Sequence, residues 1–173
     1  GKESRFGIAS SSTWSAFTTA ASNGSVNSMH DSYTPLGGFV QMLQIALGEV
    51  VFGGVGCGLY GMIGFAILTV FLAGLMVGRT PEFLGHKVEA REMKIATMVV
   101  LMHPFLILVG TGISSAIAAA NPEIGWLNNP SFHGLSEMLY EYTSSAANNG
   151  SGFEGLADNT PFWNISTAVS YTH

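Results

Sequence analysis

The chain has 173 residues, of which 47% are hydrophobic and only 10% are charged. That charged share is less than half of what soluble domains usually carry, so an ordinary soluble domain is excluded and an integral membrane protein, surrounded by membrane lipid, is indicated. The net charge of −5 and the lack of a basic stripe argue against nucleic acid as a partner. The single cysteine, Cys57, excludes an internal disulfide.

The first predicted element is a short, half-spanning helix over residues 1–17, which leads into a polar phrase at residues 18–25, Thr-Thr-Ala-Ala-Ser-Asn-Gly-Ser. The phrase returns 126 residues later at residues 144–151, Ser-Ser-Ala-Ala-Asn-Asn-Gly-Ser, with five of eight positions identical. This spacing is too long for a solenoid repeat and indicates that a larger unit is duplicated.

A turn at Tyr33-Thr34-Pro35 precedes about 42 apolar residues, 36–77, which is twice what one span needs. Its glycine-rich middle, residues 53–58, predicts two helical arms near 38–51 and 59–77 joined by irregular backbone. Such backbone at membrane depth lines a water-filled cavity or is buried in protein. The alternative is close helix packing through small residues such as Gly54 and Gly58. Glu49 is either a functional intramembrane carboxylate or a residue at a helix end beside water.

Residues 79–94 contain four of the six Lys and Arg residues and are therefore predicted to be cytoplasmic. Thr80-Pro81-Glu82 predicts a helix start there. The second span is expected from Met93 to about Ala119, with a kink at His103-Pro104. His103 is interpreted as a packed or helix-bonding residue and not as a ligand. Residues 120–130 lack Lys and Arg, as a loop outside the cell should.

A second short helix is expected over residues 132–145, before the second phrase, and an apolar run from Phe162 predicts the start of another span. The predicted fold is therefore an all-α polytopic membrane protein built from span–pore loop–span repeats related to potassium channels. We divide it into residues 1–78 (pore loop and broken span), 79–92 (cytoplasmic loop) and 93–173 (span, pore loop and start of a span). This is about one and a half repeats of a longer protein.

The repeated phrases have the composition of an ion-selective pore loop. A dehydrated alkali cation needs several oxygen ligands, which backbone carbonyls supply, and Gly24 and Gly150 can adopt the unusual backbone angles that this requires. Polar neighbours can brace the backbone or offer side-chain oxygens: Thr19, Ser22, Asn23, Asn148 and Asn149. The alternative is ordinary turn sequence containing an Asn-Gly-Ser glycosylation acceptor. The sequence shows no motif for a transition metal, hydrolysis or cofactor chemistry.

Eight stretches in order along the chain resemble the KdpA family, the channel-like subunits of bacterial Kdp potassium pumps: residues 1–7, 18–24, 48–56, 58–62, 74–82, 91–94, 144–150 and 159–164. The resemblance implies four span–pore–span repeats in a multi-pass protein of the bacterial cell membrane that selects K⁺ from outside. This chain would cover the back of the third repeat and most of the fourth. Asn23 stands where the family is associated with a smaller residue such as Cys.

The resemblance also implies roles for particular residues. Residues 22–24 and 148–150 would be the third and fourth filter segments, holding K⁺ by backbone carbonyls. The glycine-rich break would be a gate or cavity loop below the filter, formed by Glu49, Gly53, Gly54, Gly56 and Gly58. The chain would not be an enzyme on its own, because ATP would be used only by the P-type ATPase subunit KdpB, with KdpC and KdpF as small partner subunits.

Two other functions stay open on the sequence. One is a channel or symporter subunit of the Trk/Ktr/HKT type, which shares the repeat but works without P-type ATP hydrolysis. The other is a membrane-embedded scaffold whose small residues only pack helices.

Overall fold

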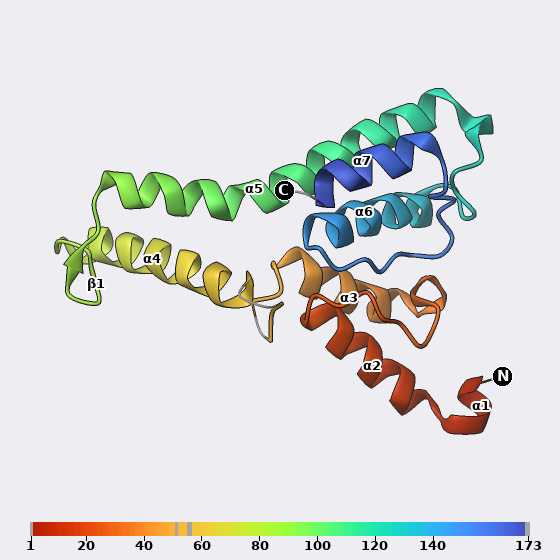
Figure 1. The fold of residues 1–173 in the computed structure, drawn as a ribbon, viewed down its shortest axis with the longest axis horizontal. Helices are drawn as coiled ribbons and strands as arrows, with labels where there is room; N and C mark the ends of the chain where they lie inside the picture. The colour runs from red at the N-terminus through yellow and green to blue at the C-terminus, as the bar shows by residue number, and fades with distance from the viewer. Residues whose placement is uncertain (1, 51, 55–56, 172–173) are drawn as a thin grey trace.

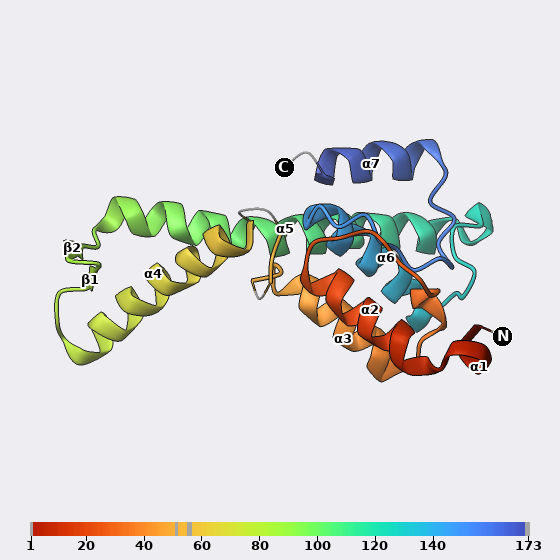
Figure 2. The ribbon, with the colours of Figure 1, turned by 60° about the horizontal axis from the view of Figure 1, so that its bottom comes forward.

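The computed structural model describes residues 2–50, 52–54 and 57–171 and shows a mainly helical chain (Figure 1). Two parts are visible in both views (Figures 1 and 2). One is a lobe in which α2 (Ile8–Ala20), α3 (Pro35–Ala46), α6 (Phe132–Ala146) and α7 (Pro161–Tyr171) lie together. The other is an arm in which α4 (Cys57–Val77) packs along the first half of α5 (Ala90–Ala120), whose second half returns to the lobe.

The N-terminal part confirms the expected helix before the first polar phrase. A short α1 (Lys2–Phe6) is followed by α2, which runs three residues into the phrase itself. The 3-10 helix η1 (His30–Ser32) then leads to α3, which begins at Pro35. Proline suits this first-turn position because its missing N–H would have no partner there and its φ angle is already helical.

The predicted break in the apolar run is confirmed, whereas the assignment of its two arms to one broken span stays a prediction. The first arm, α3, ends at Ala46, earlier than the expected residue 51, because Gly48 and Glu49 both have positive φ angles (78° and 52°). Phe52 and Gly53 are also left-handed, with φ angles of 68° and 56°. The second arm, α4, resumes at Cys57.

The expected helix start at Thr80-Pro81-Glu82 is wrong. Residues 82–87 form a small antiparallel hairpin instead, in which β1 (Glu82–Phe83) pairs with β2 (His86–Lys87). Leu84 and Gly85 turn the chain with positive φ angles of 51° and 80°, the combination that a two-residue hairpin turn needs. Helix α5 begins only at Ala90, where Glu89 and Glu92 cap its first turn reciprocally.

The second span is confirmed. Helix α5 has 31 residues, about 46 Å at 1.5 Å per residue, and continues through Pro104. Among the described residues, α4 and α5 are the two helices long and apolar enough to cross a membrane. Only 6% of the apolar window of α4 is buried, so its side chains face outward, as lipid or further protein segments would require.

Aromatic residues hold the lobe together. Trp163 of α7 is fully buried against Trp126, Met138 and Tyr142, and Tyr142 reaches the Ser114 hydroxyl of α5 at 2.9 Å. The 3-10 helix η2 (Pro122–Ile124) joins α5 to this region. Helix α7 begins at Pro161, next to the expected Phe162; that it starts another membrane span stays a prediction.

Candidate ion-binding loops

The two polar phrases fold in the same way. Helix α2 ends at Ala20 and α6 ends at Ala146, again 126 residues apart. Ser22 and Asn148, at equivalent positions, have nearly the same left-handed φ angles, 53° and 56°. The backbone hydrogen bonds also match: Ala21 N to Phe17 O and Asn23 N to Thr18 O in the first loop, Ala147 N to Thr143 O and Asn149 N to Ser144 O in the second. The duplication inferred from sequence is therefore a structural one.

The two loops touch each other. The Ser22 hydroxyl donates a 2.7 Å hydrogen bond to the carbonyl of Ala147. Gly24 lies so close to the second loop that a Cβ atom there would be 2.6 Å from the Asn149 carbonyl oxygen. Both glycines were expected to adopt unusual backbone angles, but only Gly150 has a positive φ, at 84°. Gly24 is needed for the close approach instead.

Within the first loop, threonines act as braces. Thr19 is fully buried, and its hydroxyl lies 2.7 Å from Gln44 Oε1, so it joins α2 to α3. Thr18 was not selected from the sequence, yet its Oγ1 lies 2.7 Å from the carbonyl oxygens of both Asn23 and Ser25. Thr18 is the first residue of the repeated phrase, and this position could have marked it as a candidate in the sequence. The exposed Asn23 accepts a 2.8 Å bond from Ser25 N, which tightens the loop.

In the second loop, Asn149 is buried and its side-chain amide donates a 2.6 Å hydrogen bond to Glu49 Oε1. The Asn149 amide oxygen accepts a 2.9 Å bond from the Ser151 hydroxyl. That hydroxyl lies 2.9 Å from Tyr140 OH, which in turn lies 2.9 Å from His30 Nδ1. Burial lowers the pKa of His30, which favours a neutral ring. Ser151, Tyr140 and His30 were missed, because only the tertiary fold brings them together.

The glycine-rich break packs against the first loop. Gly53 N donates a 3.2 Å hydrogen bond to the Ala20 carbonyl at the end of α2. A Cβ atom on Gly58 would be 2.6 Å from Gly53 Cα, and Gly54 N lies 3.0 Å from Cys57 Sγ. Gly56, also predicted to belong to the gate or cavity loop, lies outside the described residues.

A cavity of about 460 Å³ adjoins the break and the second loop. Its wall includes the break, the start of α4, the middle of α5 and the residues just before Asn149: Ala46, Leu47, Gly48, Glu49, Val50, Cys57, Tyr60, Gly61, Phe65, Val99, Val100, His103, Pro104, Ala146, Ala147 and Asn148. Of the described residues predicted to form the gate or cavity loop, Glu49 lines this cavity, whereas Gly53, Gly54 and Gly58 do not. Gly53 and Gly58 pack against each other within the break, and the role of the break stays a prediction. The His103 Nε2 atom lies 3.2 Å from the carbonyl oxygen of Ile45 in α3. This contact agrees with the interpretation of His103 as a residue that bonds to a helix.

Neither repeated phrase contains a charged residue, so the loops offer carbonyl, hydroxyl and amide groups. Glu49 is the carboxylate that contacts them through Asn149. Neutral oxygen ligands of this kind suit a weakly hydrated monovalent cation, which must be bound and released quickly.

The fold and these loops define a helical membrane protein with two equivalent units, each a short helix followed by a polar loop. The chain belongs to the KdpA family, described as the potassium-transporting ATPase A subunit, whose model matches residues 1–172.

Curated relatives carry the name potassium-transporting ATPase potassium-binding subunit. The chain is 67% identical over 171 residues to the one from Clostridium botulinum (strain Eklund 17B), a match that covers 98% of this chain and 29% of that protein. It is 66% identical over 170 residues to the Clostridium perfringens protein (98% and 29% covered) and 62% identical over 174 residues to the Phocaeicola vulgatus protein (98% and 30% covered). The chain thus spans about 30% of the length of the relatives it matches.

Proposed function

We propose that the whole protein is the potassium-binding, channel-like subunit of an ATP-driven potassium uptake pump. In this proposal, the chain contributes two of four filter segments, residues 22–24 and 148–150, as the third and fourth repeats. The names of the relatives support potassium as the ion and an ATPase as the complex.

The observation that carries the proposal is the equivalence and mutual contact of the two loops. Each follows a short helix that ends at the same position of the repeat, and Ser22 joins one loop to the carbonyl of Ala147 in the other. The C-terminal end of a helix carries a partial negative charge, so α2 and α6 would both favour a cation at the loops. Two such units make half of a four-part ring of carbonyl oxygens.

Below the filter, the break would act as a gate or cavity loop through Glu49, Gly53, Gly54, Gly56 and Gly58. The cavity beside Asn148 supports this, because it extends from the second loop to the break and the His103–Pro104 region of α5. An ion leaving the filter would enter such a space before delivery to a partner subunit.

The partners in this proposal are the P-type ATPase subunit KdpB, which alone would use ATP, and the small subunits KdpC and KdpF. The chain itself would be non-hydrolytic, and the complex would lie in the bacterial cell membrane with residues 79–92 on the cytoplasmic side. A Trk/Ktr/HKT-type channel or symporter is disfavoured, since the relatives are named as ATPase subunits.

The test uses the full-length protein purified with its associated subunits. ATP hydrolysis is titrated with K⁺ and then Na⁺ for the wild type, for Gly150→Asp and for Gly125→Asp. Gly125 is a matched control, because it also has a positive φ (69°) but nothing lies within 4 Å of its Cβ position, whereas Gly150 faces Gly24.

We expect K⁺-stimulated hydrolysis in the wild type and in Gly125→Asp, and its loss in Gly150→Asp. Stimulation by K⁺ that survives in Gly150→Asp would contradict a filter role for the second loop. Potassium flux in vesicles without any associated ATPase would instead support the channel or symporter class.

A further inference from the structure

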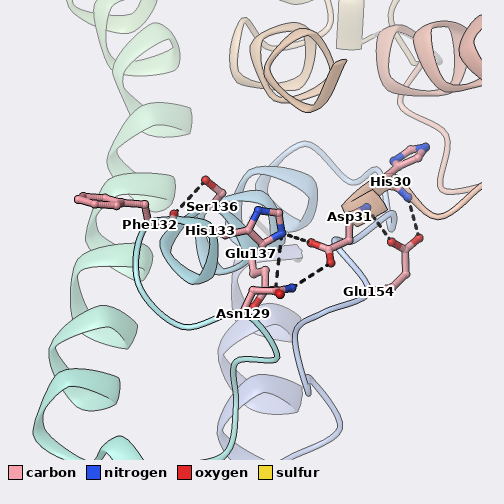
Figure 3. Close-up of polar contacts among 8 residues, drawn as sticks. All are labelled: His30, Asp31, Asn129, Phe132, His133, Ser136, Glu137 and Glu154. Atoms are coloured by element: carbon pink, nitrogen blue, oxygen red, sulfur yellow. Dashed lines mark hydrogen bonds and ion pairs between the residues drawn. The ribbon is translucent and has the colours of Figure 1, made fainter. Parts of the chain in front are cut away.

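Three ionisable side chains from two distant parts of the chain meet where η1 faces the first turns of α6 (Figure 3). His133 Nε2 lies 2.6 Å from Asp31 Oδ1 and 3.8 Å from Glu137 Oε1. One ligand atom from each residue can be chosen so that all three lie within 4.8 Å of one another. His133 and Glu137 are one helical turn apart on α6, so their side chains lie on the same face.

The two carboxylates in this cluster share a single ion-pair partner, the imidazole of His133. The Glu137 side chain is fully buried, and its Oε2 atom has no hydrogen-bond partner. Among the described residues, no Lys or Arg forms an ion pair with Asp31 or Glu137, and His133 is their ion-pair partner. Burying a carboxylate without a cation or full hydrogen bonding is costly, so the cluster is suited to a bound cation.

The surroundings hold these side chains in place. The Asn129 amide lies 3.1 Å from Glu137 Oε1 and 3.4 Å from Asp31 Oδ2 (Figure 3). Glu154 accepts hydrogen bonds from the backbone N–H groups of His30 (3.3 Å) and Asp31 (3.1 Å), and the His133 ring stacks on Phe153 with ring centroids 6.2 Å apart. Groups of this kind orient metal ligands in proteins.

The backbone of Gly155 packs directly against the carboxylates of Asp31 and Glu137. A Cβ atom at this position would collide with Glu137 Oε1 and would lie 2.9 Å from Asp31 Oδ2. Only glycine therefore allows the backbone to approach the two carboxylates this closely.

We propose that Asp31, His133 and Glu137 bind a divalent transition-metal cation of the Zn²⁺ type. One imidazole nitrogen with two carboxylate oxygens is a donor set that Zn²⁺ accepts, whereas K⁺ and Mg²⁺ prefer oxygen ligands alone. Binding needs a neutral His133, so the cation takes the place of the proton between His133 and Asp31. The bound ion would join the segment after the first loop to the helix before the second.

The experiment uses the purified, intact complex, stripped with a chelator, exchanged into Zn²⁺ and dialysed. Zinc content is measured by mass spectrometry for the wild type, Asp31→Asn, His133→Gln and Glu137→Gln. His86→Gln is the control, because His86 is an exposed histidine in the β1–β2 hairpin, away from the cluster. Since the His133 side chain is 43% exposed, His133→Gln should fold even if Glu137→Gln does not.

We expect about one more zinc per complex in the wild type and His86→Gln than in the cluster variants, and a Zn²⁺-dependent rise in melting temperature that the cluster variants lose. Co²⁺ in place of Zn²⁺ should give visible absorption bands that disappear in His133→Gln. Equal zinc content in the wild type, Asp31→Asn and His133→Gln would overturn the proposal. Zinc content and melting temperature report on the metal site and not on the filter. K⁺-stimulated hydrolysis is measured separately in each variant, so a failure of the zinc proposal and a failure of the filter proposal can be told apart.

Discussion

The side-chain amide of Asn149 donates a 2.6 Å hydrogen bond to Glu49 Oε1, joining two residues that are 100 positions apart in the chain. Both residues are buried: 5% of the surface of Asn149 is exposed, and 3% of that of Glu49. The bond links the second polar loop directly to the glycine-rich break. A displacement of the break would therefore move the second loop. In our proposal, this bond couples the gate to the filter.

Replacing Asn149 with Asp tests this link. The change would place two buried carboxylates at hydrogen-bond distance, and an uncompensated buried charge costs about 3–5 kcal/mol. We expect a clearly lower melting temperature of the purified complex in detergent, with weaker apparent affinity for K⁺ in the ATPase assay. Asn27→Asp, an exposed position in the loop after the first phrase, is the control and should melt like the wild type.

The double variant Asn149→Asp/Glu49→Gln makes the test specific. The glutamine amide can donate to the new aspartate, so the hydrogen bond returns with its direction reversed. We expect most of the lost melting temperature to be recovered. A double variant no more stable than Asn149→Asp alone would show that the pair does not interact as described.

Gly24→Ala tests the contact between the loops. The new Cβ atom would lie 2.6 Å from the Asn149 carbonyl oxygen, which is backbone and must shift. Overpacking of this kind costs about 1–3 kcal/mol, so the apparent K⁺ affinity should fall by roughly tenfold. Gly112→Ala in α5, where nothing lies within 4 Å, should leave it unchanged. Unaltered affinity in Gly24→Ala would argue against close loop contact.

Gly58→Ala tests the break. Its Cβ atom would lie 2.6 Å from Gly53 Cα, so the start of α4 and the break must separate. If the break gates ion passage, turnover should fall by roughly tenfold for about 1.4 kcal/mol of added barrier, while K⁺ affinity changes little. Shortening residues 53–58 should act in the same direction. The matched control is Gly64→Ala on the same helix, whose closest contact would be an ordinary 3.9 Å. A change in affinity alone would contradict a gating role.

The last prediction concerns pH. Burial, with a smaller contribution from the charge of Asp158, raises the pKa of Glu141 to about 7. This pKa lies above 4.5, the ordinary value, so the folded chain favours the protonated carboxyl of Glu141. The contribution of that protonated form to the free energy of unfolding is complete below about pH 4.5 and is lost as the pH rises through 7. Glu141→Gln should therefore raise the free energy of unfolding at pH 8 by about 1–2 kcal/mol after screening, seen as a higher melting temperature, but should have no such effect at pH 4.5.

The exposed Glu123→Gln serves as the control for this pH series and should follow the wild type throughout. A stabilising effect of Glu141→Gln that is the same at pH 4.5 and pH 8 would show that the side chain, and not its ionisation, is responsible.

Much of the fold could be predicted from local features of the sequence. The apolar run at 36–77 and its central glycines predicted the broken span because glycine destabilises a helix wherever it occurs. The hairpin at 82–87 could not be predicted in the same way. Pro81 is compatible with a helix start, whereas the turn depends on Leu84 adopting a positive φ angle that non-glycine residues seldom take.

The sequence by itself determined the apolar helices, the place of the break and the duplication of the polar phrase, because these depend on residues close together in the chain. Only the tertiary structure decided that Asn149 contacts Glu49, that Ser22 reaches Ala147 and that Asp31 meets His133. Each of these contacts joins residues at least 100 positions apart. Such contacts depend on how whole helices pack against each other, and no local spacing in the chain encodes that arrangement.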